Sequence, residues 1–432
     1  MPRLYIKTFG CQMNVYDSTR MRDALAVHGY RETDDVSVAD VILLNTCHIR
    51  EKASEKIFSE LGRIARQKKK NALVVVAGCV VQADGQEILR RASVIDIAVG
   101  PQNYHQLPQL IAQYQRKKGR LLKADFPAEM KFDFLPLPQQ SKASAFLAIQ
   151  EGCDHFCSYC VVPYTRGCEY SRSIKDVLKE AKALVKAGAK EIMLLGQNVN
   201  GWHGDEGKDF GDLLRAVAKI RGLKRLRYTT SYPSEMTPNM IEAHKDLKNL
   251  MPYIHLPIQS GSDKVLKAMN RQYTVQEYEK IVADFRKVCP DIAVSSDFIV
   301  GFPGETEEDF EQTLQLVERI GYASSYSFKY SARPGTPASL MKNQVPEDVK
   351  TKRLMRLQAL LLKQQKAFNM ASVGKEFDVL LTEKGKEKGQ LLGYSPYLQG
   401  TIVKAPLKLL GEIVRVKVIA ATATALKAEL LR

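Results

Sequence analysis

The ten residues at positions 151–160, EGCDHFCSYC, carry the sharpest pattern in this chain. They place Cys153, Cys157 and Cys160 at the spacing C-x3-C-x2-C, directly after a run at 146–150 that is typical of a β-strand. Three thiolates on one short loop can hold three irons of a 4Fe–4S cluster and leave the fourth iron open. A zinc site is the alternative, and it needs a fourth close ligand that only His155 or Cys168 can supply.

Downstream of this loop, strand-like runs alternate with helical patterns, which is typical of a β/α fold. Helices are expected between the strands, for example at 174–187 and 307–320. Strands are expected at 146–150, 191–195, 225–229, 253–256, 293–299 and 325–330. Six β/α repeats are too few for a complete eight-stranded barrel, so we expect a partial (β/α)6 TIM-like barrel. Its active site should lie at the carboxyl ends of the strands.

The first 115 residues follow the same alternation on a smaller scale. Strands expected at 4–9, 41–44 and 73–77 are separated by helices expected at 17–28, 49–67 and around 85–91. The helix at 49–67 repeats apolar residues every three to four positions, which predicts one buried face. Strands joined by helices in this way predict a doubly wound parallel α/β domain.

Three single cysteines occupy equivalent places in this domain. Cys11 follows the first expected strand, Cys47 the second and Cys79 the third. Because the carboxyl ends of parallel strands meet at one edge of a sheet, we expect the three thiols to converge. A single cysteine at such a place is more often a small buried apolar residue than a metal ligand. Three thiolates together suit zinc with an outside fourth ligand, or an iron–sulfur cluster with one unique iron.

The last part of the chain concentrates basic charge. Residues 346–432 hold 16 basic and 8 acidic side chains, which is half of the net charge of +16. A basic helix is expected at 346–370, followed by short β-runs that predict a small β-barrel. These runs are 376–382, 400–404, 413–419 and 425–430. A concentrated basic module favours a nucleic-acid partner, and a solubility tail is the alternative.

Composition excludes several classes of protein. Eight cysteines argue for metal or redox chemistry rather than a disulfide framework if the chain is cytoplasmic, as we expect. No apolar run approaches the ~18–20 residues that a membrane span needs. Met1 leads directly into the strand-like residues 4–6, which leaves no room for a signal peptide. Cys168 is expected to be a free thiol, and Cys289 to lie in the core.

Motifs spread over the chain resemble the radical SAM methylthiotransferase family. They are KTFGCQMNVYDS (7–18), NTCHIREKA (45–53), VAGC (76–79), the loop at 151–160 with VVPYTRG (161–167), LLGQNVNGW (194–202), HLPIQSGSD (255–263) and SDFIVGFPGE (296–305). The basic C-terminal segment resembles a TRAM domain. Gln12-Met13-Asn14 and Arg50-Glu51-Lys52 are more similar to the branch that acts on tRNA than to the branch that modifies a ribosomal protein.

The resemblance implies a domain plan and two cofactor sites. Residues 1–118 would form the methylthiotransferase domain, 119–138 a linker, 139–370 the radical SAM domain and 371–432 a TRAM-like RNA-binding domain. Cys153, Cys157 and Cys160 would hold the 4Fe–4S cluster that cleaves S-adenosyl-L-methionine (SAM). An auxiliary 4Fe–4S cluster would be held by Cys11, Cys47 and Cys79.

The resemblance also implies where SAM binds. The expected residues follow strands of the barrel: Gly196, Gln197, Asn198, Gln259, Ser260, Asp297, Gly301 and Glu305. Glu305 has a second interpretation, because an acidic side chain in the first turn of a helix is favoured by the helix dipole. No protein side chain is expected to be the catalytic group, since the clusters carry the chemistry.

The implied reaction is methylthiolation of carbon 2 of isopentenylated adenosine at position 37 of tRNA. The radical would remove the hydrogen at carbon 2, and a second SAM would supply the methyl group. Expected partners are the tRNA anticodon stem-loop, an electron donor such as flavodoxin or ferredoxin, and a sulfur donor, with a monomeric protein and no membrane. Another tRNA adenosine or a ribosomal protein is the alternative substrate, and a non-catalytic iron–sulfur RNA-binding protein is the alternative class.

Overall fold

The computed structural model describes the backbone of residues 1–47 and 51–431 and the side chains of residues 1–47 and 56–431. The chain divides into two compact units. The first consists of Met1–Gln139, Glu151–Asp154 and Val161–Tyr170, and the second of Gln140–Gln150, His155–Cys160 and Ser171–Arg432. Cys153 and the segment Val161–Tyr170 therefore belong to the first unit, whereas Cys157 and Cys160 belong to the second.

The first unit is built on a six-stranded parallel sheet in the order β2-β1-β3-β4-β5-β6. Its strands are β1 (Arg3–Thr8), β2 (Arg31–Glu32), β3 (Val41–Thr46), β4 (Leu73–Gly78), β5 (Ile97–Val99) and β6 (Leu121–Lys123). The sequence predicted only β1, β3 and β4, because the other three strands are two or three residues long. The strand β6 lies inside the segment that was expected to be a linker.

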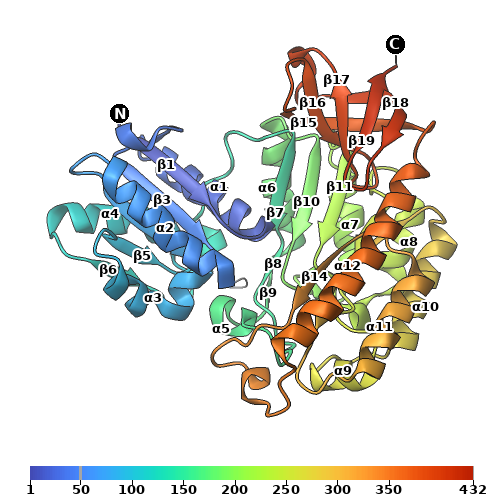
Figure 1. Cartoon of the computed structure of the whole chain (residues 1–432). Helices are drawn as coiled ribbons and strands as arrows, with labels where there is room; N and C mark the ends of the chain where they lie inside the picture. Colours follow the sequence, from blue (N-terminus) through green and yellow to red (C-terminus); the bar gives the residue numbers. More distant parts are fainter. Residues whose placement is uncertain (48–50, 432) are drawn as a thin grey trace. The chain divides into compact units, whose positions relative to one another are not determined.

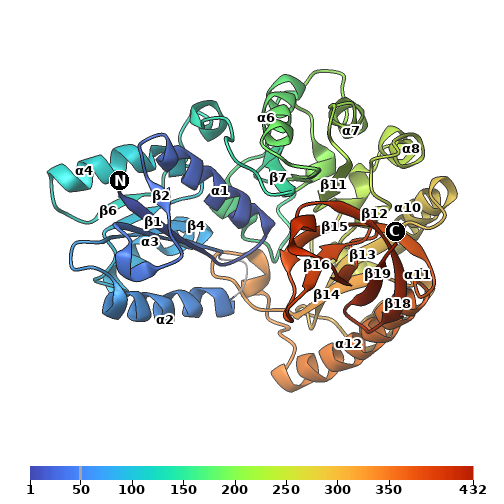
Figure 2. The ribbon, with the colours of Figure 1, turned by 90° about the horizontal axis from the view of Figure 1, so that it is seen from above.

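Helices cover both faces of this sheet (Figure 2). The helices α1 (Gln12–Ala26) and α4 (Leu107–Arg116) pack on one face, and α2 (Glu51–Gln67) and α3 (Cys79–Arg91) pack on the other. In β3, Val41 and Leu43 point to the first face, and Ile42 and Leu44 point to the second. A strand that is apolar on both sides is typical of a sheet buried between two helical layers. The predicted doubly wound parallel domain is confirmed.

The second unit contains six parallel strands that follow one another in chain order (Figure 1). Two three-stranded sheets, β7-β10-β11 and β12-β13-β14, are linked by a parallel bridge between Leu226 and Leu250. The strands are β7 (Ser144–Ala148), β10 (Glu191–Leu195), β11 (Arg225–Thr229), β12 (Tyr253–His255), β13 (Ala293–Val300) and β14 (Ser324–Lys329). The predicted partial (β/α)6 barrel is confirmed, with each strand within two residues of its expected bounds.

Helices follow the strands of this partial barrel. They are α6 (Ile174–Lys186), α7 (Phe210–Ala218), α8 (Pro238–Asp246), α9 (Asp263–Ala268), α10 (Val275–Val288) and α11 (Glu307–Ile320). The segment between β7 and α6 contains β8 (Gln150–Glu151), α5 (Val162–Arg166) and β9 (Tyr170–Ser171). No helix in the described part of the chain is long and apolar enough to span a bilayer.

The long helix α12 (Glu347–Met370) leads into a closed five-stranded barrel in the order β15-β16-β17-β19-β18 (Figure 1). Its strands are β15 (Glu376–Lys384), β16 (Gln390–Tyr394), β17 (Gly400–Lys404), β18 (Ile413–Ala421) and β19 (Leu426–Leu430). The predicted small barrel is confirmed, but β16 was not among the expected strands. Gly393 interrupts its pattern, and a Cβ at that position would collide with the carbonyl of Leu380.

Candidate active site

The three N-terminal cysteines lie at the carboxyl ends of three adjacent strands. Cys11 follows β1 and precedes the first turn of α1, Cys47 follows β3, and Cys79 is the first residue of α3 after β4. The order of the sheet reverses between β1 and β3, which is the switch point where open α/β sheets bind ligands. A hydrogen bond from Cys47 lowers the pKa of Cys11 to about 6. The structure therefore brings the thiols of Cys11 and Cys47 into contact, and it places Cys79 at the end of the neighbouring strand.

Two glycines make this close approach possible. Gly10 has φ +133°, and a Cβ on it would lie 2.6 Å from the Cβ of Cys47. Gly78 has φ +101°, and a Cβ on it would collide with the carbonyl of Thr46. Both backbone conformations are ones that residues with a side chain rarely adopt. The strand ends therefore approach one another only because these positions lack a side chain.

A buried charge cluster lies beside the same thiols. Arg166 pairs with Asp17 at 2.7 Å and with Glu151 at 2.6 Å, and Lys131 pairs with Glu151 at 2.6 Å. All four side chains are at most 4% exposed. Burial raises the pKa of the Cys79 thiol, and the Arg166 guanidinium opposes that change through its charge and a hydrogen bond. Arg166 thus places a fixed positive charge against the N-terminal cysteines.

The loop that follows β7 is held by backbone contacts to α9. Ser158 Oγ donates to the carbonyl of Ala268 at 2.8 Å, and Ser158 N donates to the carbonyl of Met269 at 3.0 Å. Asn270 Nδ2 donates to the carbonyls of His155 and Phe156 at 3.0 and 3.1 Å. Four hydrogen bonds therefore fix the course of the chain on both sides of Cys157, the second cysteine of the C-x3-C-x2-C motif.

A second buried arginine lies beside this loop. Arg271 Nη1 lies 3.5 Å from the sulfur of Cys157, and Arg271 Nη2 donates to the carbonyl of Pro257 at 2.8 Å. Its guanidinium also lies 4.3 Å from the ring centre of Tyr232 and 5.0 Å from that of Tyr273. Sequence reasoning missed Arg271, because no local spacing connects it with Cys157, which lies 114 residues earlier.

His155, inside the cysteine loop, joins a small polar cluster of the barrel. Its ring stacks on Tyr232 with centroids 3.6 Å apart. His155 Nε2 lies 3.1 Å from both Asn198 Nδ2 and Glu235 Oε1. Burial opposes ionisation of Glu235, but hydrogen bonds from His155 and Asn198 lower the pKa of its carboxyl. Glu235 and Tyr232 were not predicted from the sequence, and the structure places them beside Asn198, which was expected to bind SAM.

Of the residues expected to bind SAM, Gly196, Gln197 and Asn198 form a tight turn after β10. Gln150 Oε1 accepts hydrogen bonds from the backbone N–H of Gln197 at 2.8 Å and of Asn198 at 3.1 Å. A Cβ on Gly196 would lie 2.6 Å from the same oxygen. The Oδ1 atom of Asn198 is buried and has no hydrogen-bond partner within the described residues. This turn therefore presents one unpaired polar atom beside the cysteine loop.

Gln259, Ser260 and Asp297 differ in their access to the strand edge. Gln259 adopts φ +75°, and its backbone N–H donates to the carbonyl of Asp297 at 2.9 Å. Ser260 is 1% exposed and donates to or accepts from Thr313. The Asp297 carboxylate is 29% exposed and lies 3.5 Å from His255 Nε2. Asp297 can reach a ligand, whereas the side chain of Ser260 packs inward against α11.

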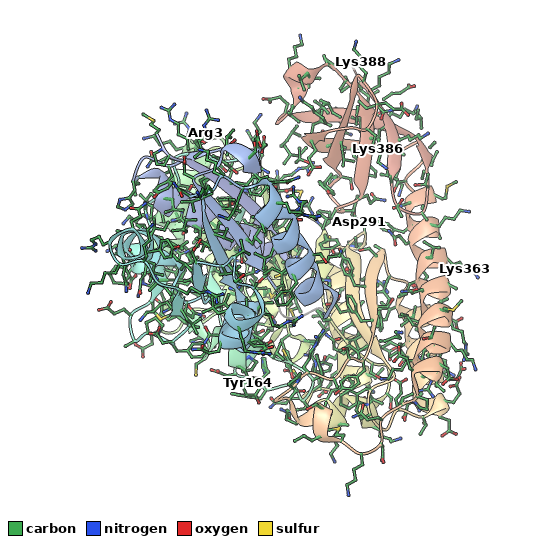
Figure 3. All side chains as sticks on the ribbon, turned by 60° about the vertical axis from the view of Figure 1, so that its left-hand side comes forward. Arg3, Tyr164, Asp291, Lys363, Lys386 and Lys388 are labelled. Atoms are coloured by element: carbon green, nitrogen blue, oxygen red, sulfur yellow. The ribbon has the colours of Figure 1, made fainter. Side chains whose placement is uncertain are left out.

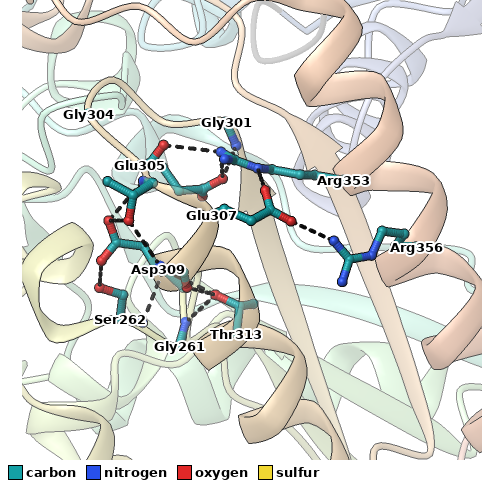
Figure 4. A network of polar contacts seen from close by, with 12 residues as sticks. Gly261, Ser262, Gly301, Gly304, Glu305, Glu307, Asp309, Thr313, Arg353 and Arg356 are labelled. Atoms are coloured by element: carbon teal, nitrogen blue, oxygen red, sulfur yellow. Dashed lines mark hydrogen bonds and ion pairs between the residues drawn. The ribbon is translucent and has the colours of Figure 1, made fainter.

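Glu305 belongs to an internal network with α11 and α12 (Figure 4). Its carboxylate accepts from Gly301 N at 2.9 Å and from Arg353 Nη1 at 2.8 Å, and burial raises its pKa to about 7. A Cβ on Gly301, which has φ +70°, would collide with the side chain of Lys350. In this structure both residues fix the loop after β13, and the Glu305 carboxylate engages Arg353 rather than the strand edge.

The remaining expected residues are placed as follows. Cys168 is exposed and Cys289 is half-buried, and both are free thiols. Arg50 of the motif Arg50-Glu51-Lys52 lies outside the described residues. Among those that are described, no group of three or more His, Cys, Asp or Glu side chains is arranged to hold a single metal ion.

Three family models match the chain in succession. The description "Uncharacterized protein family UPF0004" covers residues 3–100, "Radical SAM superfamily" covers 147–317, and "TRAM domain" covers 371–431. The three matches coincide with the doubly wound sheet, most of the partial barrel and the closed five-stranded barrel.

Solved structures share the fold at low sequence identity. The chain is 16% identical to TsrM from Kitasatospora setae, a radical S-adenosylmethionine methyltransferase with cobalamin and a [4Fe-4S] cluster bound. The match covers 79% of this chain and 77% of that one, with a TM-score of 0.60. The cobalamin-dependent S-adenosylmethionine radical enzyme OxsB is 11% identical over 84% of this chain and 56% of its own, with a TM-score of 0.54. At these identities the likeness concerns the fold alone.

Proposed function

Because the chain belongs to the radical SAM methylthiotransferase family, which includes MiaB, we propose that it methylthiolates carbon 2 of N6-isopentenyladenosine at position 37 of tRNA. The product is 2-methylthio-N6-isopentenyladenosine. The observation that carries the proposal is that Cys11, Cys47 and Cys79 follow three adjacent strands at one edge of the N-terminal sheet, with the thiols of Cys11 and Cys47 in contact. A radical SAM enzyme that only cleaved or methylated its substrate would not need this second set of thiols.

The residues present fit the cofactors of this reaction. Cys153, Cys157 and Cys160 would hold a 4Fe–4S cluster that binds SAM, and Cys11, Cys47 and Cys79 would hold a second cluster. The glycines at 10 and 78 allow the strand ends that carry these thiols to lie close to one another, since a Cβ at either position would collide with the neighbouring strand end. When bound, the barrel cluster and SAM supply a carbon-centred radical, and the N-terminal cluster supplies the sulfur atom.

The chain's own residues hold these groups in position. The charge of Arg166 opposes the rise that burial causes in the pKa of Cys79, and Arg271 Nη1 lies 3.5 Å from the sulfur of Cys157. Within the barrel, we propose that the turn at Gly196–Asn198 binds the amino-acid part of SAM, with Gln259 and Asp297 nearby. Ser260, Gly301 and Glu305 then act by fixing the loops that carry this pocket.

The basic C-terminal domain supplies RNA affinity. Clustered lysines bind phosphates without regard to sequence, so recognition of the target requires a base that is unstacked from the anticodon loop. Moving the adenine out of its stack costs roughly a few kcal/mol. The electron donor is proposed to be a flavodoxin or ferredoxin, and a separate sulfur donor restores the N-terminal site.

Mass spectrometry of tRNA nucleosides tests the proposal. Cells that lack the gene should accumulate isopentenyladenosine without its 2-methylthio group, and the wild-type gene should restore the group while Cys157→Ala and Cys47→Ala should not. An unchanged nucleoside profile would direct the search to another adenosine or to a ribosomal protein. Absence of SAM cleavage under reducing conditions would instead identify a non-catalytic RNA-binding protein.

A further inference from the structure

A groove of about 610 Å³ lies between the partial barrel and the C-terminal domain, within the second unit. Barrel residues Lys190, Lys224, Arg225 and Lys248 line one side. Lys190 and Lys224 directly precede β10 and β11, so the groove is at the amino ends of the strands. It is therefore at the end of the barrel opposite to the cysteine loop, which follows the carboxyl end of β7.

Buried arginines hold the two walls of this groove together. Arg225 Nη1 donates to the carbonyl of Tyr394 at 2.8 Å, and Arg227 donates to the carbonyls of Ser395 and Pro396 at 2.8 and 2.9 Å. Arg227 also pairs with the buried Glu191 at 2.8 Å, so its charge is compensated inside the protein. The C-terminal domain is thus docked through fixed contacts, and the groove is preformed.

The charges that face the groove do not balance. Of its two acidic residues, Asp378 pairs with Arg415 at 3.4 Å, and Glu412 pairs with Lys190. Lys224 and Lys248 are exposed, and neither has an ion-pair partner anywhere in the described part of the chain. Two lysines that form no ion pair with a described residue therefore line a groove whose two carboxylates are each paired with another cation.

The lining also indicates what kind of ligand fits. Its apolar members are Leu250, Met251, Pro252, Pro396 and Ile413, and no aromatic ring from the described residues lines it. Bases bind to proteins by stacking on aromatic rings, so this groove is unsuited to bases. Lysines act on phosphates as point charges. The C-terminal domain that forms the other side of the groove carries further lysines, among them Lys386 and Lys388 (Figure 3).

We propose that this groove binds the phosphate backbone of the RNA substrate through Lys224 and Lys248. The inference rests on the proposed function, because it takes the substrate to be RNA. An RNA strand bound in the groove would not take part in the chemistry, because the groove and the cysteine loop lie at opposite ends of the β-strands of the barrel. The barrel thereby contributes to RNA affinity in addition to the C-terminal domain.

The proposal is tested by measuring how tightly the full-length protein binds a labelled anticodon stem-loop RNA. Fluorescence anisotropy gives the affinity at several salt concentrations. The double variant Lys224→Ala, Lys248→Ala should bind roughly tenfold more weakly at low salt, and the slope of log K against log salt should fall by about 2. A variant with Lys224→Arg and Lys248→Arg should retain both affinity and slope.

A matched control separates this site from general charge effects. Lys179→Ala with Lys280→Ala removes the same charge from exposed positions in the middle of α6 and α10. This control should bind RNA within about twofold of the wild type. Equal losses in both double variants, or no loss at Lys224 and Lys248, would overturn the groove assignment.

The outcome is independent of the proposed reaction. Anisotropy reads RNA binding without turnover, and the tRNA nucleoside profile reads turnover. If the nucleoside profile is unchanged while the Lys224 and Lys248 variant loses affinity, the proposed target nucleoside is wrong and the assignment of the groove to RNA binding is supported. If the nucleoside is modified and the variant binds RNA normally, the assignment of the groove to RNA binding is wrong and the proposed reaction is supported. If the wild type does not bind RNA, the groove assignment fails as well.

Discussion

The two cysteine sites of this protein are built in opposite ways. The N-terminal site gathers thiols from three strand ends that are 32 to 68 residues apart in sequence, through sheet topology and two glycines without room for a Cβ. The barrel site carries its thiols on eight consecutive residues and holds them with backbone hydrogen bonds to α9. A site assembled by topology depends on the whole sheet, whereas a site assembled on a loop depends on its local attachments.

The buried arginines differ in the same way. Arg166 is surrounded by ionised partners, Asp17 and Glu151, which themselves pair with Lys131. Arg271 lies among neutral groups, namely the rings of Tyr232 and Tyr273 and the carbonyl of Pro257. The first arginine is one member of a four-charge network, and the second is a single cation stabilised by aromatic faces and a carbonyl.

The largest expected effect separates the functions of the two sites. Reconstituted wild-type protein should hold about eight irons, and both Cys157→Ala and Cys47→Ala should hold about four. Only Cys157→Ala should abolish SAM cleavage, because the loop thiols hold the cluster that binds SAM. Iron analysis and chromatography of 5′-deoxyadenosine measure the two quantities. A wild-type content of about four irons would mean that the N-terminal thiols hold no iron–sulfur cluster.

A smaller effect tests the difference between the two arginines. Arg166→Met should destabilise its unit by about 3–5 kcal/mol, because Asp17 and Glu151 are left with one buried cation for two carboxylates. Arg271→Met should cost about 2 kcal/mol, since no ionised partner is left unpaired. Hydrogen exchange of the full-length protein reads local stability in each unit separately. Equal losses at both positions would show that the charge network adds nothing to the N-terminal site.

The glycines allow a further comparison within the N-terminal site. Gly10→Ala and Gly188→Ala both place an alanine at positive φ, but only Gly10 has atoms within 4 Å of the new Cβ. Gly188→Ala should cost about 1–2 kcal/mol from backbone strain alone. Gly10→Ala should cost about 1–3 kcal/mol more from crowding and should lower the N-terminal iron content. Indistinguishable variants would mean that the strand ends can move apart without loss.

The same contrast explains what the sequence could predict. The barrel loop and the strand-end position of each N-terminal cysteine follow from local spacing and from the rule that parallel strands end at one edge. The partners of the thiols do not, because Arg166 and Asp17 are 149 residues apart and Arg271 and Cys157 are 114 residues apart. Glu305 illustrates the converse case. Its motif predicted a place in the pocket, but Arg353 of α12 engages its carboxylate.

The smallest expected effect concerns the two cysteines outside both sites. Burial, together with the nearby Asp291, raises the pKa of Cys289 to about 12, so at pH 8 this thiol remains protonated and unreactive. Cys168 is exposed, although it lies only eight residues after Cys160. Cys168→Ser and Cys289→Ser should therefore leave iron content and SAM cleavage within about 20% of the wild type, since neither thiol ligates a cluster. Iodoacetamide at pH 8 should label Cys168 of the holoenzyme and spare Cys289, as peptide mass spectrometry will show. Loss of about half the iron in Cys168→Ser would mean that this residue is a ligand of the barrel cluster, and the site would then no longer be confined to one short loop.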